Sequence, residues 1–150
     1  MDRRLIHIIF FIFIGINAFS QQEIKLESID RPIIKIKINN IEANMLIDTG
    51  STLNVINIGD VKKYGIRKRT KFEGQLYSAS SNVAAWHIDH SYAYICDYRI
   101  HQFVSFDISA AKGSILNDTR IEITGILGTQ AIKELGMIID LKRGIVTIKK

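Results

Sequence analysis

The stretch Leu46-Ile47-Asp48-Thr49-Gly50-Ser51 carries an ionisable side chain at the end of an apolar run. A carboxylate in apolar surroundings must be hydrogen-bonded, paired or protonated. The three residues after it supply two hydroxyl groups, free backbone N–H donors and a glycine with a permissive backbone. This pattern indicates a turn that holds a carboxylate for chemistry. The simpler alternative is a turn closed by hydrogen bonds from the aspartate to its own backbone.

The residues before this turn predict a β-hairpin. Isoleucine and lysine alternate over residues 34–38, which is typical of a strand with one buried face. Asn39-Asn40 follows, and both residues tolerate positive φ, which favours a tight turn. Residues 41–47 then return as a second strand and deliver Asp48 at its end.

The rest of the chain also reads as mostly β. Short strands at intervals of about 8–12 residues predict a barrel or sandwich with one or two short helices. In the first half we expect one or two helical turns over 57–64 ended by Gly65, and a long hairpin over 72–88 with Ser80-Ser81-Asn82 at its tip. Strands are expected at 92–96 and 100–106, followed by a polar loop at 109–119 and a strand at 121–127. The chain is then expected to form a helix over 130–135 capped by Thr129, and a closing hairpin of 137–141 and 145–148.

The first residues have the features of a signal peptide. Arg3 and Arg4 precede an apolar stretch over 8–19, and Ala18-Phe19-Ser20 resembles a cleavage site. The stretch is shorter than the ~20 apolar residues of a membrane-spanning helix. We therefore expect 1–20 to be a signal peptide and 21–150 to be one exported domain, periplasmic or secreted, without stable membrane insertion after cleavage. An uncleaved anchor is the alternative.

Charge and cysteine content narrow the choice of partners. The net charge is +5, and many of the cations lie at residues 62–63 and 67–71. No aromatic interleaving or nucleic-acid motif accompanies them, so we expect a solvated loop and no nucleic-acid partner. Cys96 is the one cysteine, which excludes an internal disulfide framework, and its apolar neighbours predict a small buried side chain.

The sequence predicts neither a metal nor a cofactor. His87 and His90 lie three apart, so on a strand they point to opposite faces and do not converge on one ion. No glycine-rich loop of the kind that holds phosphates is present.

The order of the parts resembles that of the retropepsin-like aspartic proteases. The residues that carry the resemblance are Asp48-Thr49-Gly50-Ser51, the later Gly125-Ile126-Leu127-Gly128, and the short helix and hairpin that end the chain. The resemblance extends over about residues 33–148. It implies an all-β fold with a closed β-barrel, the single lobe of an acid protease. Such an active site needs two aspartates, so one motif implies a homodimer in which two copies of Asp48 meet at a two-fold axis.

The resemblance also assigns roles within the motif. It implies that Asp48 is the catalytic acid and base and activates a water, without a metal or a covalent intermediate. Thr49 is expected to bond to the partner's loop, and the Gly50 amide to donate to the carboxylate. The Ser51 hydroxyl is expected to bond the outer carboxylate oxygen.

Two further groups of residues follow from the resemblance. The support beneath the loop is expected from Ile126, Leu127 and Gly128. The flap, which closes over an extended peptide, is expected at Tyr77, Ser78, Ala79, Ser80, Ser81 and Asn82. The function implied is an aspartic endopeptidase that acts on polypeptides. The alternative is a catalytically inactive domain of the same fold that binds peptides or proteins.

Overall fold

The computed structural model describes residues 21–71, 77–78, 81–82, 84–88 and 93–149. The predicted signal peptide, residues 1–20, lies outside the described residues, and so do His90 and the flap residues Ala79 and Ser80. Within the described ranges, no helix has the length and apolar character that crossing a membrane requires.

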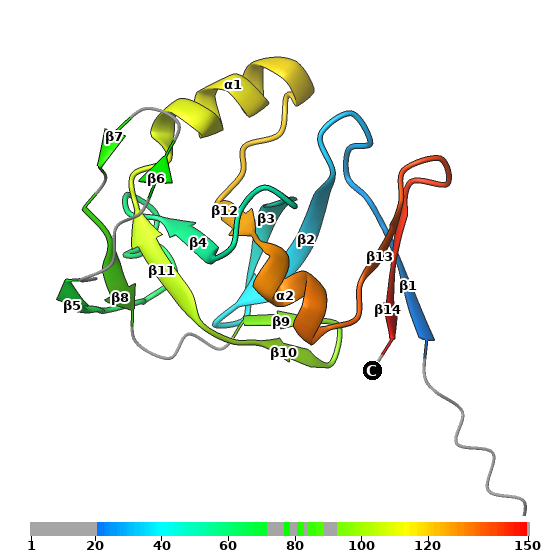
Figure 1. Cartoon of the computed structure of the whole chain (residues 1–150), viewed down its shortest axis with the longest axis horizontal. Coiled ribbons are helices and arrows are strands. Elements are labelled where there is room, and N and C mark those ends of the chain that lie inside the picture. The colour runs from blue at the N-terminus through cyan, green and yellow to red at the C-terminus, as the bar shows by residue number, and fades with distance from the viewer. Residues whose placement is uncertain (1–20, 72–76, 79–80, 83, 89–92, 150) are drawn as a thin grey trace, which may run out of the picture.

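The described chain is mostly β-strand with two helices (Figure 1). In chain order the elements are β1 (Gln21–Lys25), β2 (Ile33–Ile38), β3 (Ile41–Ile47), β4 (Asn54–Asn57), β5 (Lys68–Lys71), β6 (Tyr77–Ser78), β7 (Ser81–Asn82), β8 (Trp86–Ile88), β9 (Ala93–Ile95), β10 (Tyr98–Ile100), β11 (Phe103–Phe106), α1 (Ser109–Thr119), β12 (Gly125–Leu127), α2 (Thr129–Glu134), β13 (Ile138–Asp140) and β14 (Ile145–Lys149).

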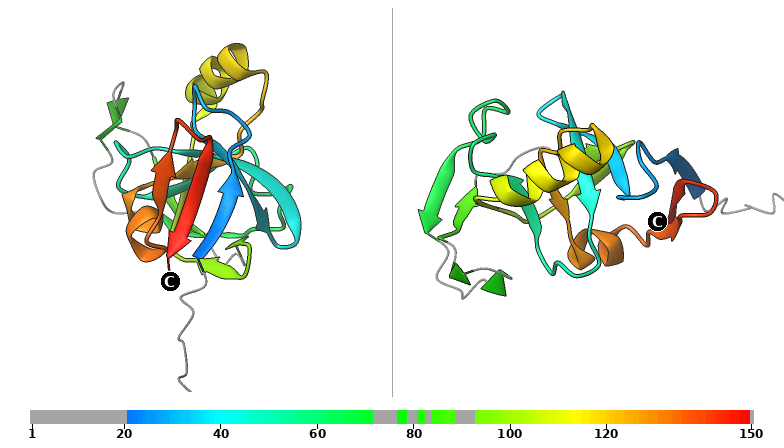
Figure 2. Two further views of the ribbon diagram at one scale, coloured as in Figure 1. Left: turned by 90° about the vertical axis from the view of Figure 1, so that its right-hand side faces the viewer. Right: turned by 90° about the horizontal axis from the view of Figure 1, so that it is seen from above.

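The strands form one large sheet and two small ones. The large sheet has the order β10-β9-β2-β3-β12-β4-β11-β8-β5, and β6 pairs with β7 alone. The third sheet, β1-β14-β13, covers one end of the molecule (Figure 2, left). The prediction of a mainly β fold is confirmed. Among the described strands the large sheet ends at β10 and β5, and its closure into a barrel stays a prediction.

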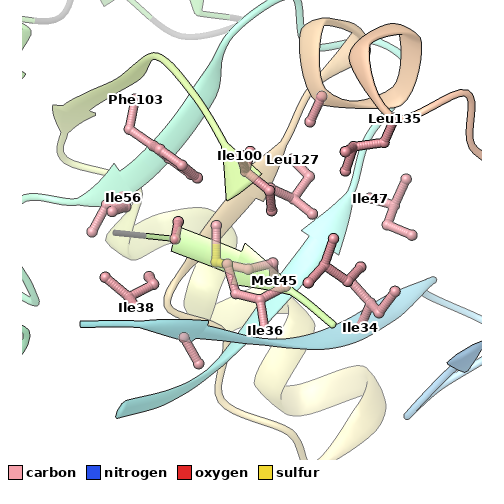
Figure 3. Close-up of a cluster of buried hydrophobic side chains, with 14 of the residues drawn as sticks. Ile34, Ile36, Ile38, Met45, Ile47, Ile56, Ile100, Phe103, Leu127 and Leu135 are labelled. Carbon is pink, nitrogen blue, oxygen red and sulfur yellow. The ribbon is translucent and has the colours of Figure 1, made fainter. Parts of the chain in front are cut away.

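The main core lies between the large sheet and the β1-β14-β13 sheet. Residues of β2 and β3 meet Leu127 of β12 and Leu135 at the end of α2 in one apolar cluster (Figure 3). Val146 and Ile148 of β14 belong to the same cluster and are fully buried. Apolar side chains from both sheets therefore bury one another, which is the main driving force for this arrangement.

The hairpin of β2 and β3 has the predicted form. Asn39 and Asn40 have φ of 49° and 67°, and Ile38 pairs with Ile41 across the turn. A two-residue turn with both φ values positive matches the right-handed twist of the flanking strands. The isoleucines of β2 are buried and its lysines are exposed, so the register follows from the side-chain alternation.

Strand β12 enters the sheet between β3 and β4. It runs parallel to β3, with Leu127 opposite Ile47, and antiparallel to β4. Gly125 makes the close approach possible, because a Cβ there would lie 2.0 Å from the carbonyl oxygen of Val55. This pairing brings the segment Gly125 to Gly128 directly beside Asp48.

The polar segment 109–119, predicted as a loop, is the helix α1. Its sequence has no apolar periodicity, and only Ile115 is buried. The helix depends on contacts with distant residues instead. Lys112 forms ion pairs of 2.5 Å with Asp60 and 3.2 Å with Glu122. The sequence of the segment alone does not predict these contacts, because both partners lie outside it.

The Lys112 ion pairs make a testable contribution to stability. We expect Lys112→Gln to lower the free energy of unfolding by about 1–2 kcal/mol at pH 7, because Lys112 and Asp60 are largely buried and the pair is hydrogen-bonded. The measurement is urea unfolding. Lys142→Gln, at an exposed lysine, is the control and should change stability by less than about 0.5 kcal/mol. Equal effects of the two substitutions would contradict this role.

The same contacts set a pH dependence. Burial lowers the pKa of Lys112, but hydrogen bonds and charges from Asp60 and Glu122 outweigh it and raise the pKa above its ordinary 10.5. A pKa raised by folding gives stability that is full below the unfolded value and is lost as pH rises through the folded value. The difference between wild type and Lys112→Gln should therefore shrink above about pH 10.5.

Two predictions in the middle of the chain are wrong in detail. Cys96 is exposed, because β9 ends at Ile95 and Cys96 lies in the turn between β9 and β10 with φ of 51°. Partial burial and the neighbouring Asp97 raise the pKa of its thiol. The predicted strand 100–106 is interrupted at Gln102, which also has positive φ. Strand β1, which pairs with β14, was not expected at all.

The basic segment is exposed, as predicted, but part of it is not a loop. Residues 68–71 form β5, an edge strand that pairs only with β8 in the described sheet. Lysine side chains on an edge strand discourage pairing with other chains. Residues 58–65 form successive turns rather than a helix, and Gly65 ends them with φ of 65°.

Candidate active site

Asp48 lies directly after β3 and is held from both sides. Its backbone N–H donates to the carbonyl of Leu127 at 3.0 Å. The Gly50 N–H donates to Asp48 Oδ1 at 2.8 Å, which is the contact expected of this glycine. Gly50 and Thr49 are exposed, and Asp48 itself is half-buried. The carboxylate is thus fixed by backbone groups and keeps an open side.

The Ser51 side chain does not take its expected place. Its hydroxyl donates to the carbonyl of Leu53 at 2.9 Å and not to the Asp48 carboxylate. The Ser51 N–H donates to the carbonyl of Asp48 at 3.2 Å, which closes the turn. Ser51 therefore shapes the loop that runs from Asp48 to Leu53, and we call this segment the aspartate loop.

The start of α2 docks onto the aspartate loop. The first N–H groups of a helix lack partners within the helix. Here Thr129 N–H donates to the Ser51 carbonyl at 2.8 Å, and Gln130 N–H donates to the Thr52 carbonyl at 3.2 Å. The predicted cap at Thr129 is wrong: Gly128 is the N-cap, and no side chain caps the helix. Carbonyl groups of the loop do so instead.

Gly128 permits this close contact. A Cβ at Gly128 would lie 2.4 Å from the carbonyl oxygen of Leu53 and 2.7 Å from that of Ser51. Leu127 is buried in the main core, and half-buried Ile126 packs against the separate cluster that contains Val55. The three residues expected to support the loop therefore lie against it or beneath it.

One residue of this region was missed from the sequence. Asn54, the first residue of β4, is completely buried. Its Oδ1 accepts the Gly128 N–H at 3.0 Å, and its Nδ2 donates to the His101 carbonyl at 3.0 Å. The signal was an amide between apolar Leu53 and Val55, because a buried amide in a strand needs partners.

Four residues of the segment expected to form the flap lie in two paired strands, β6 and β7. Tyr77 pairs with Asn82, and Ser78 pairs with Ser81. Ser81 and Asn82, expected at the tip, thus lie in strand β7. In Figure 1 this hairpin lies at the end of the molecule opposite β1, β13 and β14.

The Asp48 carboxylate is the charged group of this site. Among the described residues no ion pair neutralises Asp48, and no three His, Cys, Asp or Glu side chains are grouped to hold a metal. His87 lies exposed in β8. A carboxylate with one bound amide and an open side can take up a proton or bind a water molecule.

Comparisons with known proteins agree with this geometry. Residues 34–131, well over half of the chain, match a family model described as aspartyl protease. No curated protein matches the sequence significantly.

Three solved structures share the fold. EIAV protease complexed with the inhibitor HBY-793 is 20% identical, with a TM-score of 0.51 over 77% of this chain and 95% of that one. A retropepsin-like aspartic protease from Rickettsia conorii is 14% identical, with a TM-score of 0.54 over 86% and 90%. The retroviral protease-like domain of Ddi1 from Leishmania major is 17% identical, with a TM-score of 0.56 over 83% and 88%.

Proposed function

Because the chain belongs to the aspartyl protease family, we propose that it is an aspartic endopeptidase whose active site is formed by Asp48 of two identical subunits. The observation that carries this proposal is the held carboxylate: the Gly50 N–H binds Asp48 Oδ1, and Leu127 accepts the Asp48 N–H. The sequence holds this Asp-Thr-Gly motif once. A second copy of the chain therefore supplies the second aspartate.

The two carboxylates act as a pair. Aspartic proteases are themselves the known example of two aspartates that share one proton, because both cannot ionise at close range. The ionised Asp48 removes a proton from a water molecule, and the water oxygen attacks the peptide carbonyl carbon. The protonated Asp48 donates its proton to the carbonyl oxygen. The tetrahedral intermediate then breaks at the C–N bond: the Asp48 that took the water proton gives it to the departing amine nitrogen, and a hydroxyl of the intermediate returns a proton to the other Asp48 as the C=O bond re-forms.

A polypeptide is the substrate this site suits. The hairpin of β6 and β7 presents strand backbone, which can pair with an extended peptide by strand addition. The closed barrel and the flap movement implied by the family resemblance belong to this proposal. In this proposal the peptide lies between the β6–β7 hairpin and the aspartate loop.

Cleavage of an unfolded protein tests the activity. Purified residues 21–150 should cleave a denatured protein at acidic pH, and a peptide analogue with a tetrahedral hydroxyl in place of the scissile carbonyl should inhibit the reaction. Peptide binding without cleavage, at every pH where the fold is stable, would instead indicate the inactive binding module.

Dimer formation is the second prediction of this proposal. Strand β13 is an edge of its sheet and carries exposed Ile138, with exposed Leu141 just after it, so a second copy can cover both. We expect residues 21–150 to sediment as a dimer and Ile138→Lys to raise the dimer Kd at least about 10-fold. Ile41→Lys, at the exposed isoleucine that begins β3, is the control. A wild-type chain that stays monomeric at acidic pH would exclude the two-subunit site.

We also propose that the chain is exported and that residues 1–20 are removed. The supports are the charged start, the apolar stretch and the small residues before Gln21. Mass determination of the mature protein should give a chain that begins at Gln21. A retained N-terminus in a membrane fraction would indicate an anchor.

A further inference from the structure

Asn54 occupies a point where three segments of the chain meet. It follows the aspartate loop directly and begins β4. Its oxygen reaches the β12–α2 junction at Gly128, and its nitrogen reaches His101 in the link between β10 and β11. The side chain has no exposed surface, so its amide forms no hydrogen bonds with bulk water. A polar group buried in this way is stabilised only by its two protein contacts.

The aspartate loop is thereby held at both of its ends. At the first end, Asp48 N–H donates to Leu127. In the middle, the carbonyls of Ser51 and Thr52 accept the first N–H groups of α2. At the far end, Asn54 Oδ1 accepts the Gly128 N–H, which lies in the same short junction. Removing the Asn54 amide frees the far end and leaves the buried Gly128 N–H without a partner.

We propose that Asn54 is a positioning residue for the reaction at Asp48, acting through the aspartate loop and not by contact with substrate. The inference rests on the proposed endopeptidase function. The consequence for catalysis follows from geometry: the Asp48 carboxylate must meet its twin and a shared water within hydrogen-bond distance. A displacement of about 1 Å in such an arrangement can cost about 100-fold in rate.

Asn57 provides a matched control on the same strand. It is also buried, at 5% exposure, and lies at the other end of β4. Its Oδ1 accepts the Ile108 N–H at 3.2 Å, and its Nδ2 donates to Asp60 at 3.0 Å. Both asparagines thus use the amide oxygen for a backbone N–H and the nitrogen for a second segment. Only Asn54 is joined to the junction beneath Asp48.

The kinetic test compares Asn54→Ala with Asn57→Ala in the dimeric protein. We expect Asn54→Ala to lower kcat about 10–100-fold with KM changed less than about 3-fold, because substrate contacts remain while the carboxylates are misplaced. Asn57→Ala should lose comparable stability but keep kcat within about 2-fold. Equal loss of kcat in the two variants, or an unchanged kcat in Asn54→Ala, overturns the proposal.

Asn54→Asp tests the same bonds if the alanine variant does not fold. A protonated carboxyl can accept the Gly128 N–H and donate to the His101 carbonyl, whereas an ionised one faces that carbonyl with a negative charge. We expect kcat relative to wild type to be near one at the acid end of the profile and to fall as pH rises. His101 Nε2 lies 3.6 Å from Glu134 Oε1, and these two groups and Asp48 are present in both proteins, so the ratio isolates the effect of the introduced carboxyl. A ratio independent of pH overturns the proposal.

Amide hydrogen exchange separates this inference from the proposed function. Loss of the Asn54 amide should accelerate exchange at Gly128 and at Gly50, whereas Asn57→Ala should leave both rates as in wild type. This readout needs no cleavage. If the wild type cleaves nothing, the proposed endopeptidase fails, and the exchange rates still decide whether Asn54 holds the loop. Unchanged exchange at Gly128 in Asn54→Ala overturns that role.

Discussion

Asp48→Asn is expected to reduce kcat by roughly 10²–10⁴-fold while the protein remains folded and dimeric. An asparagine oxygen can still accept the Gly50 N–H, so the aspartate loop keeps its main local contact. The neutral amide cannot remove a proton from water or return one to the peptide. The measurement is the initial rate of peptide cleavage at acidic pH, with circular dichroism and sedimentation of the same samples.

Asp107→Asn is the matched control for this substitution. Asp107 Oδ1 accepts the N–H of Ser109, two residues further along, just as Asp48 accepts that of Gly50. The hydrogen bonds from Ser109 hold the pKa of Asp107 below its ordinary value. We expect kcat of Asp107→Asn within about 2-fold of wild type. If Asp48→Asn keeps comparable activity, Asp48 is not the catalytic group.

Gly128→Ala is expected to cause a large loss of stability, because the added methyl group has no room beside the aspartate loop. The new Cβ would lie 2.4 Å from the Leu53 carbonyl oxygen and 2.7 Å from that of Ser51, and both contacts are with backbone. Backbone cannot rotate away as a side chain can, so the junction and the aspartate loop must separate. We expect the free energy of unfolding to fall by about 3 kcal/mol or more in urea titration, with cleavage lost.

Gly113→Ala is the control for the added methyl group. Gly113 lies inside α1, and a Cβ there would meet nothing within 4 Å. Alanine is the better helix former, so this variant should be more stable than wild type by about 0.5–1 kcal/mol. If Gly128→Ala is tolerated as well as Gly113→Ala, the loop and junction are not packed as described.

The sequence predicted those parts of the fold whose cause is local. The β2–β3 hairpin follows from side-chain alternation and two asparagines that accept positive φ. The closing hairpin of β13 and β14 is confirmed for the same reason, since its strands are apolar and its turn contains Gly144. Helix α1 was missed because its stabilising partners, Asp60 and Glu122, lie outside it in the sequence.

At the candidate site, too, contacts between residues close in the sequence were predicted and contacts between distant residues were not. The Gly50 contact with Asp48 is local, two residues apart, and was expected. The docking of α2 onto the loop joins residues far apart in sequence, so a side-chain cap at Thr129 was expected where loop carbonyls are used. Asn54 was missed because its partners lie far away in the sequence: Gly128 is brought near by the pairing of β12 with β4, and His101 by the pairing of β11 with β4.

The central claim, that one active site needs Asp48 from both subunits, is tested most directly by subunit mixing. Wild type and Asp48→Asn are unfolded together in equal amounts and refolded, so that subunits pair at random. If each site needs two aspartates, only wild-type pairs cleave, and the total activity falls to about one quarter of that of an all-wild-type sample at the same total protein concentration. Activity of about one half would show that each subunit works with its own Asp48 and would contradict the account.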